Sequence, residues 1–117
     1  MSNINIDVLN QLADDIAAED LRPVLAAFES DMQRLGAEMS VAASAGDLAS
    51  YRRSAHAIAG AAGAVGAVTI ERTARNASKI ADSEQAAAVA DAAAVEELVR
   101  EAVSVLRQFV ASKAPPA

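Results

Sequence analysis

The sequence predicts an all-α protein, and three observations support this fold class. Hydrophobic residues make up 53% of the 117 residues but aromatic residues only 3%, and alanine, the strongest helix former, supplies much of the difference. Apolar residues recur every three or four positions, which is the spacing of a buried helix face. Strand-like runs in which β-branched and polar residues alternate are missing. We assign residues 1–113 to a single domain and residues 114–117 to a disordered tail.

The N-terminal part of the chain is expected to form two helices. The first spans about Ile4–Ile16 and should pack across one end of the core, because apolar residues repeat there at a strict four-residue spacing. The second opens with Asp20 as its N-cap and Pro23 in its first turn, and Ser44-Ala45-Gly46 ends it. Its buried stripe comprises Leu21, Val24, Leu25, Phe28, Met32, Leu35 and Met39.

Three further helices are expected in the rest of the chain. Asp47 caps the third, which runs over Leu48–Val65 and ends at Gly66. The fourth covers Val68–Ala81, and the fifth covers Ala87–Ala111 after a polar break. Short connections between long helices imply antiparallel neighbours. We therefore expect an antiparallel up-down-up-down four-helix bundle with an additional short N-terminal helix.

Composition and charge exclude several classes of function. The absence of cysteine excludes disulfides, thiolate metal sites and cysteine nucleophiles, and neither a signal segment nor an apolar run of spanning length is visible, so we expect a cytoplasmic protein. The net charge is -6, but residues 50–80 contain five basic residues and one acidic residue: Arg52, Arg53, Arg72, Arg75 and Lys79 against Glu71. Such a chain is a poor nucleic-acid binder and a better candidate for docking an acidic pocket on another protein.

His56, the single histidine, is the candidate functional residue. It lies roughly 140° from the centre of the buried stripe of its helix and should face solvent, with Gly60 and Gly63 on the same outward face and Arg52 and Arg53 one turn before it. A glycine inside a helix costs about 1 kcal/mol relative to alanine. The glycines therefore indicate a surface that is kept clear for close approach by another protein.

The residues around His56 fit few kinds of chemistry. No ligand-spaced metal cluster, phosphate loop or dinucleotide fingerprint is visible, and Ser54 lies on the opposite side of the helix from His56, so the two cannot form a nucleophilic pair. Phosphoryl transfer remains, because a neutral imidazole nitrogen is a competent nucleophile near pH 7. Such a carrier needs no cofactor of its own if its partner supplies the acidic residues and the magnesium.

The segment around His56 resembles the phosphorylation motif of the histidine phosphotransfer domains of bacterial multistep phosphorelays. The matching residues are Ala55, His56, Ile58, Gly60, Ala61 and Ala62, followed by Val65, Gly66 and Ala67. The resemblance extends outward to Asp47 and to the preceding helix with Phe28. It implies that His56 accepts a phosphoryl group from a receiver-domain aspartyl-phosphate and passes it to another receiver-domain aspartate. The implied partners are receiver domains of response regulators and hybrid histidine kinases, and no autokinase activity is expected.

One position departs from the motif. The family usually carries a lysine three residues after the histidine, where this chain has Ala59. Arg52 or Arg53 is expected to supply the missing charge, since both lie within side-chain reach of a phosphoryl group on His56. Separate alanine variants of the two arginines should then differ in phosphohistidine lifetime or transfer rate, and Ala59→Lys should restore part of any loss.

Two alternatives come from other functional classes. The bundle could act as a non-phosphorylated docking or inhibitory module for response regulators, in which case replacing His56 would leave partner affinity unchanged. A lyase or hydrolase with His56 as its base is the other alternative, and it would require a concave site with a second catalytic group. In each case we expect a monomer that binds neither nucleic acid nor membrane.

Overall fold

The computed structural model describes residues 4–113, and this part of the chain contains five helices and no strand. The molecule measures 53 × 21 × 21 Å. The predicted all-α class is confirmed, while the expected tail at residues 114–117 lies outside the described residues. In chain order the helices are α1 (Ile6–Asp15), α2 (Ala18–Ala45), α3 (Leu48–Ala64), α4 (Val68–Ala77) and α5 (Gln85–Lys113).

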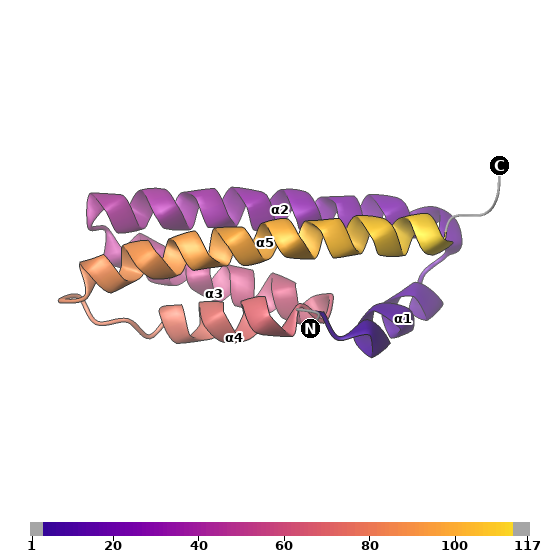
Figure 1. The fold of residues 1–117 in the computed structure, drawn as a ribbon, viewed down its shortest axis with the longest axis horizontal. Coiled ribbons are helices and arrows are strands. Elements are labelled where there is room, and N and C mark those ends of the chain that lie inside the picture. The colour runs from indigo at the N-terminus through magenta and orange to yellow at the C-terminus, as the bar shows by residue number, and fades with distance from the viewer. Residues whose placement is uncertain (1–3, 114–117) are drawn as a thin grey trace.

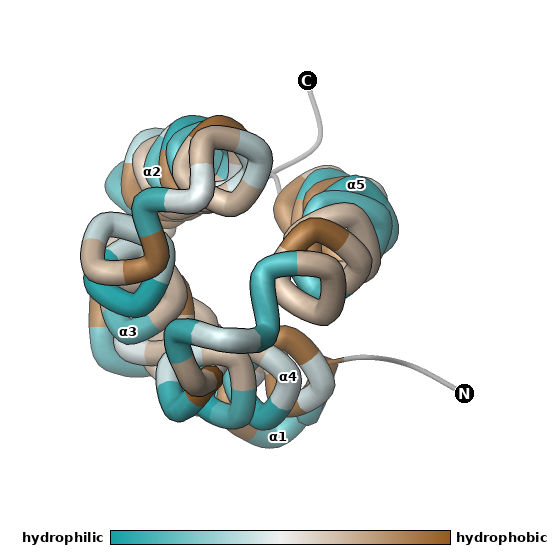
Figure 2. Tube along the Cα trace, turned by 90° about the vertical axis from the view of Figure 1, so that its left-hand side faces the viewer, coloured by the Kyte–Doolittle hydropathy of each residue, from teal (hydrophilic) through white to brown (hydrophobic). Residues whose placement is uncertain are grey.

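The last four helices form the predicted antiparallel bundle. The long helices α2 and α5 lie side by side along the molecule, and the shorter α3 and α4 cover about half of their length (Figure 1). Seen end-on, the four helices surround a common core in the order α2, α3, α4, α5 (Figure 2). The closest packing joins α2 to α3 and α5, and α3 to α4, while α3 and α5 lie diagonally opposite and touch little.

The short helix α1 lies obliquely beyond the end of the α3–α4 pair (Figure 1). It begins two residues later than predicted, because the Asn5 side chain caps it by accepting a hydrogen bond from the Asp7 backbone N–H at 3.0 Å. The Asn5 backbone N–H donates to the carbonyl of Gly66 at 2.7 Å, which ties this helix to the α3–α4 turn. Ile4 and Leu9 are buried and join α1 to the core.

The predicted start of α2 is wrong. The helix begins at Ala18, and its N-cap is Ala17, whose side chain makes no capping hydrogen bond. Asp20 is therefore a first-turn residue together with Glu19, where negative charge interacts favourably with the helix dipole. Pro23 consequently lies in the second turn rather than the first.

The connection between α4 and α5 is also longer than predicted. α4 ends at Ala77 instead of Ala81, and α5 starts at Gln85 instead of Ala87. Hydrogen bonds tie both ends of this connection to other helices: Arg52 Nη1 of α3 donates to the carbonyl of Ile80 at 3.0 Å, and Gln85 Nε2 donates to the carbonyl of Ala43 in α2 at 3.1 Å. Because these partners are remote in sequence, local helix signals could not reveal them.

Tyr51 is a fully buried residue of α3 whose hydroxyl has no hydrogen-bond partner among residues 4–113. Burial, with a smaller contribution from the charge of Asp91, raises the pKa of Tyr51 from 10.0 to about 12. An unsatisfied buried hydroxyl costs about 1 to 3 kcal/mol. We therefore expect Tyr51→Phe to increase the free energy of unfolding by about 1 kcal/mol at pH 7.

The same substitution should change the pH dependence of stability. Below pH 10 Tyr51 is neutral in both states, so its contribution is unchanged. Between pH 10 and about 12 the tyrosine of the unfolded chain ionises while the buried one does not, so the native protein loses stability as the pH rises. Urea titrations of both proteins from pH 7 to 11.5 measure this loss, and equal losses would contradict the prediction.

Candidate functional site

The helix that carries His56 begins at a well-defined N-cap. Asp47 accepts hydrogen bonds from the backbone N–H of Ser50 at 3.2 Å and from the Ser50 hydroxyl at 2.7 Å. These bonds, the hydroxyl bond first, hold the pKa of Asp47 below its usual value. Gly46 precedes this cap with a φ of 73° and ends α2, as predicted. The cap therefore defines the start of the helix that presents His56.

His56 is exposed, as the periodicity of the sequence predicts. Its side chain makes no hydrogen bond or ion pair with any other residue between positions 4 and 113. Five depressions on the described surface are lined by other residues, and His56 borders none of them. The imidazole is thus presented on the exposed face of α3, outside these depressions.

The two glycines that follow His56 have different surroundings. A Cβ atom added to Gly60 would meet nothing within 4 Å, so this part of the outward face is open. A Cβ on Gly63 would lie 3.0 Å from the Glu71 carboxylate oxygen Oε2 of α4. The absent side chain at Gly63 therefore makes room for Glu71, which the sequence did not predict. Gly60 alone has the open surroundings expected for both glycines.

Replacing Gly60 by residues with a side chain should change the stability of the protein and the rate of phosphoryl transfer in opposite directions. Gly60→Ala is expected to stabilise the protein by up to about 1 kcal/mol, because nothing opposes the added methyl group. Gly60→Leu should obstruct a partner that approaches His56 and so slow phosphoryl transfer. Urea unfolding and single-turnover transfer measure the two effects, and a native transfer rate in Gly60→Leu would contradict the expected clearance.

Arg52 lies on the α4 side of α3 and holds the segment that follows α4. Its Nη1 atom donates to the Ile80 carbonyl at 3.0 Å and forms an ion pair with Asp82 at 2.9 Å. The side chain is only 32% exposed. The guanidinium group is therefore already bonded to the segment after α4, whereas the helix spacing alone suggests that it is available to His56.

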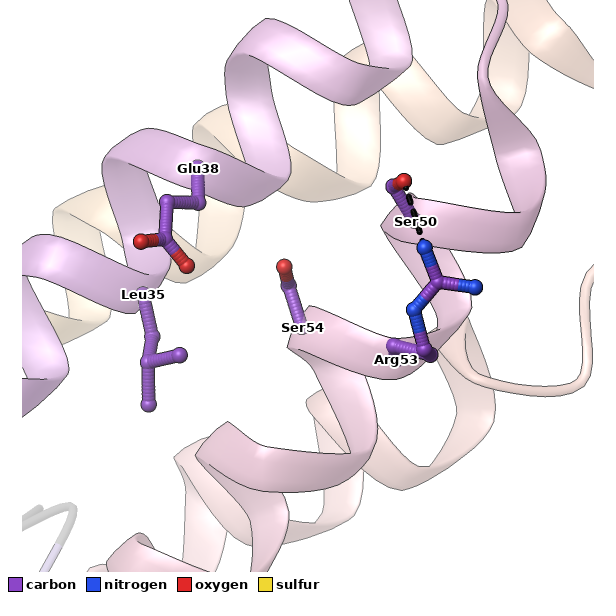
Figure 3. Close-up of a pocket in the computed structure, with 5 residues that line it drawn as sticks. All are labelled: Leu35, Glu38, Ser50, Arg53 and Ser54. Atoms are coloured by element: carbon purple, nitrogen blue, oxygen red, sulfur yellow. Dashed lines mark hydrogen bonds between the residues drawn. The ribbon is translucent and has the colours of Figure 1, made fainter.

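Arg53 turns toward the start of α3 rather than toward His56. Its Nη2 atom donates to the Ser50 hydroxyl at 2.8 Å. Figure 3 shows the Arg53 side chain extending toward Ser50 at the rim of a depression between α2 and α3. Ser54 lines the α3 side of the same depression. Leu35 and Glu38 line its α2 side. Arg53 thus borders this depression, and the imidazole of His56 does not.

Ala59, which occupies the position of the missing lysine, is 2% exposed. Its helical position is one turn from Gly63, next to the edge of α3 that packs on α4. Helix spacing places positions 52, 53 and 59 near His56. Position 59 holds a buried alanine, and the arginines at the other two positions are bonded to Asp82 and Ser50.

A family model for the Hpt domain matches residues 23–109. The chain belongs to the Hpt domain family. No curated protein and no solved structure gives a significant match to it. The matched region of this Hpt domain contains all of α3 and α4 and most of α2 and α5, whereas α1 lies outside it. His56 is the one histidine within it.

The described part of this Hpt domain shows neither a metal site nor a membrane span. No three His, Asp or Glu side chains gather between residues 4 and 113 in a way that could hold a metal ion. Within the same residues no helix is both long and apolar enough to cross a membrane. The basic residues of positions 50–80 lie on α3, on α4 and in the turn that follows α4, and these neighbouring helices pack against each other.

Proposed function

We propose that the protein is a phosphorelay carrier: His56 accepts a phosphoryl group from the aspartyl-phosphate of one receiver domain and passes it to the aspartate of another. Membership of the Hpt domain family implies histidine phosphotransfer in phosphorelays. The observation that carries the proposal is the exposed His56 beside the open surface at Gly60. A receiver domain could approach the imidazole there without meeting a side chain from position 60.

The transfer requires a nucleophile on this chain and little else. One imidazole nitrogen forms an N–P bond with its lone pair while the P–O bond to the receiver aspartate breaks, and the carboxylate leaves with that electron pair. The charge on the phosphoryl oxygens is neutralised during transfer mainly by magnesium, which the receiver domain would hold. His56 needs no cleft of its own, because the docked partner encloses the reacting atoms.

The expected partners are receiver domains of response regulators and hybrid histidine kinases. Their phosphorylated aspartate lies in an acidic pocket, and the basic residues of α3 and α4 would complement that charge. The proposal includes a monomeric carrier in the cytoplasm that binds neither nucleic acid nor membrane. It also includes the absence of autokinase activity, because phosphoryl groups would enter only from a receiver domain.

Incubation with a phosphorylated receiver domain tests the proposed function. Phosphate should appear on this chain in an acid-labile and base-stable form, as expected for phosphohistidine. A receiver domain that loses its phosphoryl group at the same rate with and without the protein would contradict the proposal.

A non-phosphorylated docking or inhibitory module is the second candidate. One observation favours it: the positions considered for a cation near His56 hold either a buried alanine or an arginine bonded elsewhere. This function predicts that a receiver domain binds the protein and its His56→Gln variant with equal affinity, and that neither protein becomes labelled. Binding measurements combined with the phosphate assay separate the two functions.

A further inference from the structure

Among residues 4–113, three of the five basic residues at positions 50–80 have no acidic partner: Arg53, which donates to the Ser50 hydroxyl, and Arg72 and Lys79, whose side chains make no bond. Glu71 pairs with Arg75 at 2.6 Å, so α4 neutralises one of its own cations. Arg72 and Lys79 are exposed and pair with no acidic residue within the described part of the chain. Either residue could supply positive charge to a phosphoryl group on His56, provided that it lies close enough.

The packing of α3 against α4 decides between these two residues. Two contacts fix the alignment of the antiparallel helices: Arg52 reaches the Ile80 carbonyl, and Gly63 faces Glu71. His56 lies one turn after Arg52, so it is opposite the end of α4, and Lys79 directly precedes Ile80.

Arg72 lies one residue after Glu71, at the other end of α4. Because a helix rises 1.5 Å per residue, Arg72 lies opposite a position on α3 that is more than one turn C-terminal to His56. Side chains on a helix lean toward its N-terminus. His56 therefore leans toward the end of α4, whereas Arg72 leans away from it. Of Arg72 and Lys79, Lys79 is therefore the cation whose position along α3 matches that of the imidazole.

The acidic residues that follow Lys79 are already engaged. Asp82 pairs with Arg52 at 2.9 Å, and Glu84 accepts a hydrogen bond from the backbone N–H of Ala81 at 3.3 Å. The bonds from Arg52 also hold this segment against α3. Lys79 thus lies on a segment that is held against α3, and its ammonium group has no acidic partner from its own loop.

We propose that Lys79 binds the phosphoryl oxygens on His56 and replaces the lysine that is absent at position 59. This inference rests on the proposed phosphoryl transfer to His56. After transfer the phosphoryl group carries up to two negative charges, and a lysine ammonium offers three N–H donors to its oxygens. Arg52 acts as a positioning residue, because its two bonds hold the segment that carries Lys79.

The effect of Lys79 can be measured without a partner protein. Phosphoramidate transfers its phosphoryl group to histidine directly and releases ammonia, so the protein and its Lys79→Ala variant can both be loaded on His56. In the native protein, phosphorus NMR should show that the second ionisation of the phosphoryl group occurs at a lower pH than in Lys79→Ala. Lys79→Arg should behave as the native protein does, and Arg72→Ala serves as the charge-matched control. Identical titration midpoints in the native protein and Lys79→Ala would overturn the inference.

A receiver domain provides the second arm of the experiment. At equilibrium with a phosphorylated receiver domain, Lys79→Ala should lower the ratio of phosphorylated to free carrier by roughly two- to fivefold, the range that an exposed charge pair supports. Arg72→Ala removes another cation of positions 50–80 and should lower this ratio less than Lys79→Ala does. Equal losses in the two variants would indicate general electrostatic attraction and overturn the role of Lys79.

The two proposals fail in distinguishable ways. If neither the receiver domain nor phosphoramidate labels His56, phosphoryl transfer to this residue is refuted, and the role of Lys79 falls with it. If His56 is labelled and Lys79→Ala matches the native protein in both arms, only the role of Lys79 is refuted. A loss that is confined to the receiver arm would assign Lys79 to partner docking and would likewise contradict phosphoryl binding.

Discussion

Replacing His56 by glutamine is expected to abolish phosphoryl acceptance completely. Glutamine has no ring nitrogen that can form the N–P bond, and the structure offers no second histidine because the chain contains only one. Transfer from a labelled receiver domain, followed by gel separation, measures the loss. Label on His56→Gln at the native level would show that another residue carries the phosphoryl group.

The same substitution should leave the fold unchanged. The His56 side chain is exposed and bonds to no other residue of the described chain, so its loss should change the free energy of unfolding by at most about 0.5 kcal/mol. Ser54→Ala is the matched control, because Ser54 lies on the same helix but faces α2. This control should be phosphorylated at the native rate. Helicity and urea unfolding of both variants distinguish a lost nucleophile from a lost structure.

Gly66→Ala is expected to cause the largest loss of stability, about 3 kcal/mol. Gly66 has a φ of 75°, which disfavours any residue with a Cβ atom. An added Cβ would also lie 2.8 Å from the Asn5 carbonyl oxygen and 2.8 Å from Val8 Cβ, so α1 would have to move. Urea unfolding measures this loss.

Gly46→Ala separates the two causes of the Gly66 effect. Gly46 has a nearly identical φ of 73°, but a Cβ there would meet only the flexible Gln85 side chain, at 3.3 Å. The backbone strain should therefore remain while the clash is relieved, and we expect a loss of about 1 to 2 kcal/mol. If both variants lose the same stability, the contact with α1 contributes nothing measurable.

Much of the fold could be predicted from the sequence because local physical signals determine it. The apolar periodicity of the long segments predicts the bundle, and the turn at Gly46 and the N-cap at Asp47 are found where the sequence places them. The exposure of His56 follows from the same periodicity, since a helix fixes the angle between that residue and the buried stripe. The motif around His56 likewise requires only adjacent residues.

Helix ends were predicted less well where their hydrogen-bond partners are distant in sequence. The start of α2 differs for a local reason: Asp20 carries a capping signal, but the helix already begins at Ala18, and the Asp20 backbone N–H donates to the Ala17 carbonyl at 2.9 Å. α4 ends early at a segment whose carbonyl at Ile80 binds Arg52, a residue of another helix. Sequence spacing cannot reveal such contacts, because they depend on which helices are neighbours.

The chemistry around His56 shows the same division between sequence and tertiary structure. The sequence by itself determined the single histidine, its exposure and the absence of the usual lysine, all of which follow from positions on one helix. Only the packing of α4 on α3 decided that Gly63 accommodates Glu71 and that Arg52 binds Asp82. Spacing along a helix shows which groups a side chain could reach, but an arginine binds the strongest acceptor within its reach, and for Arg52 that acceptor comes from a segment 30 residues away.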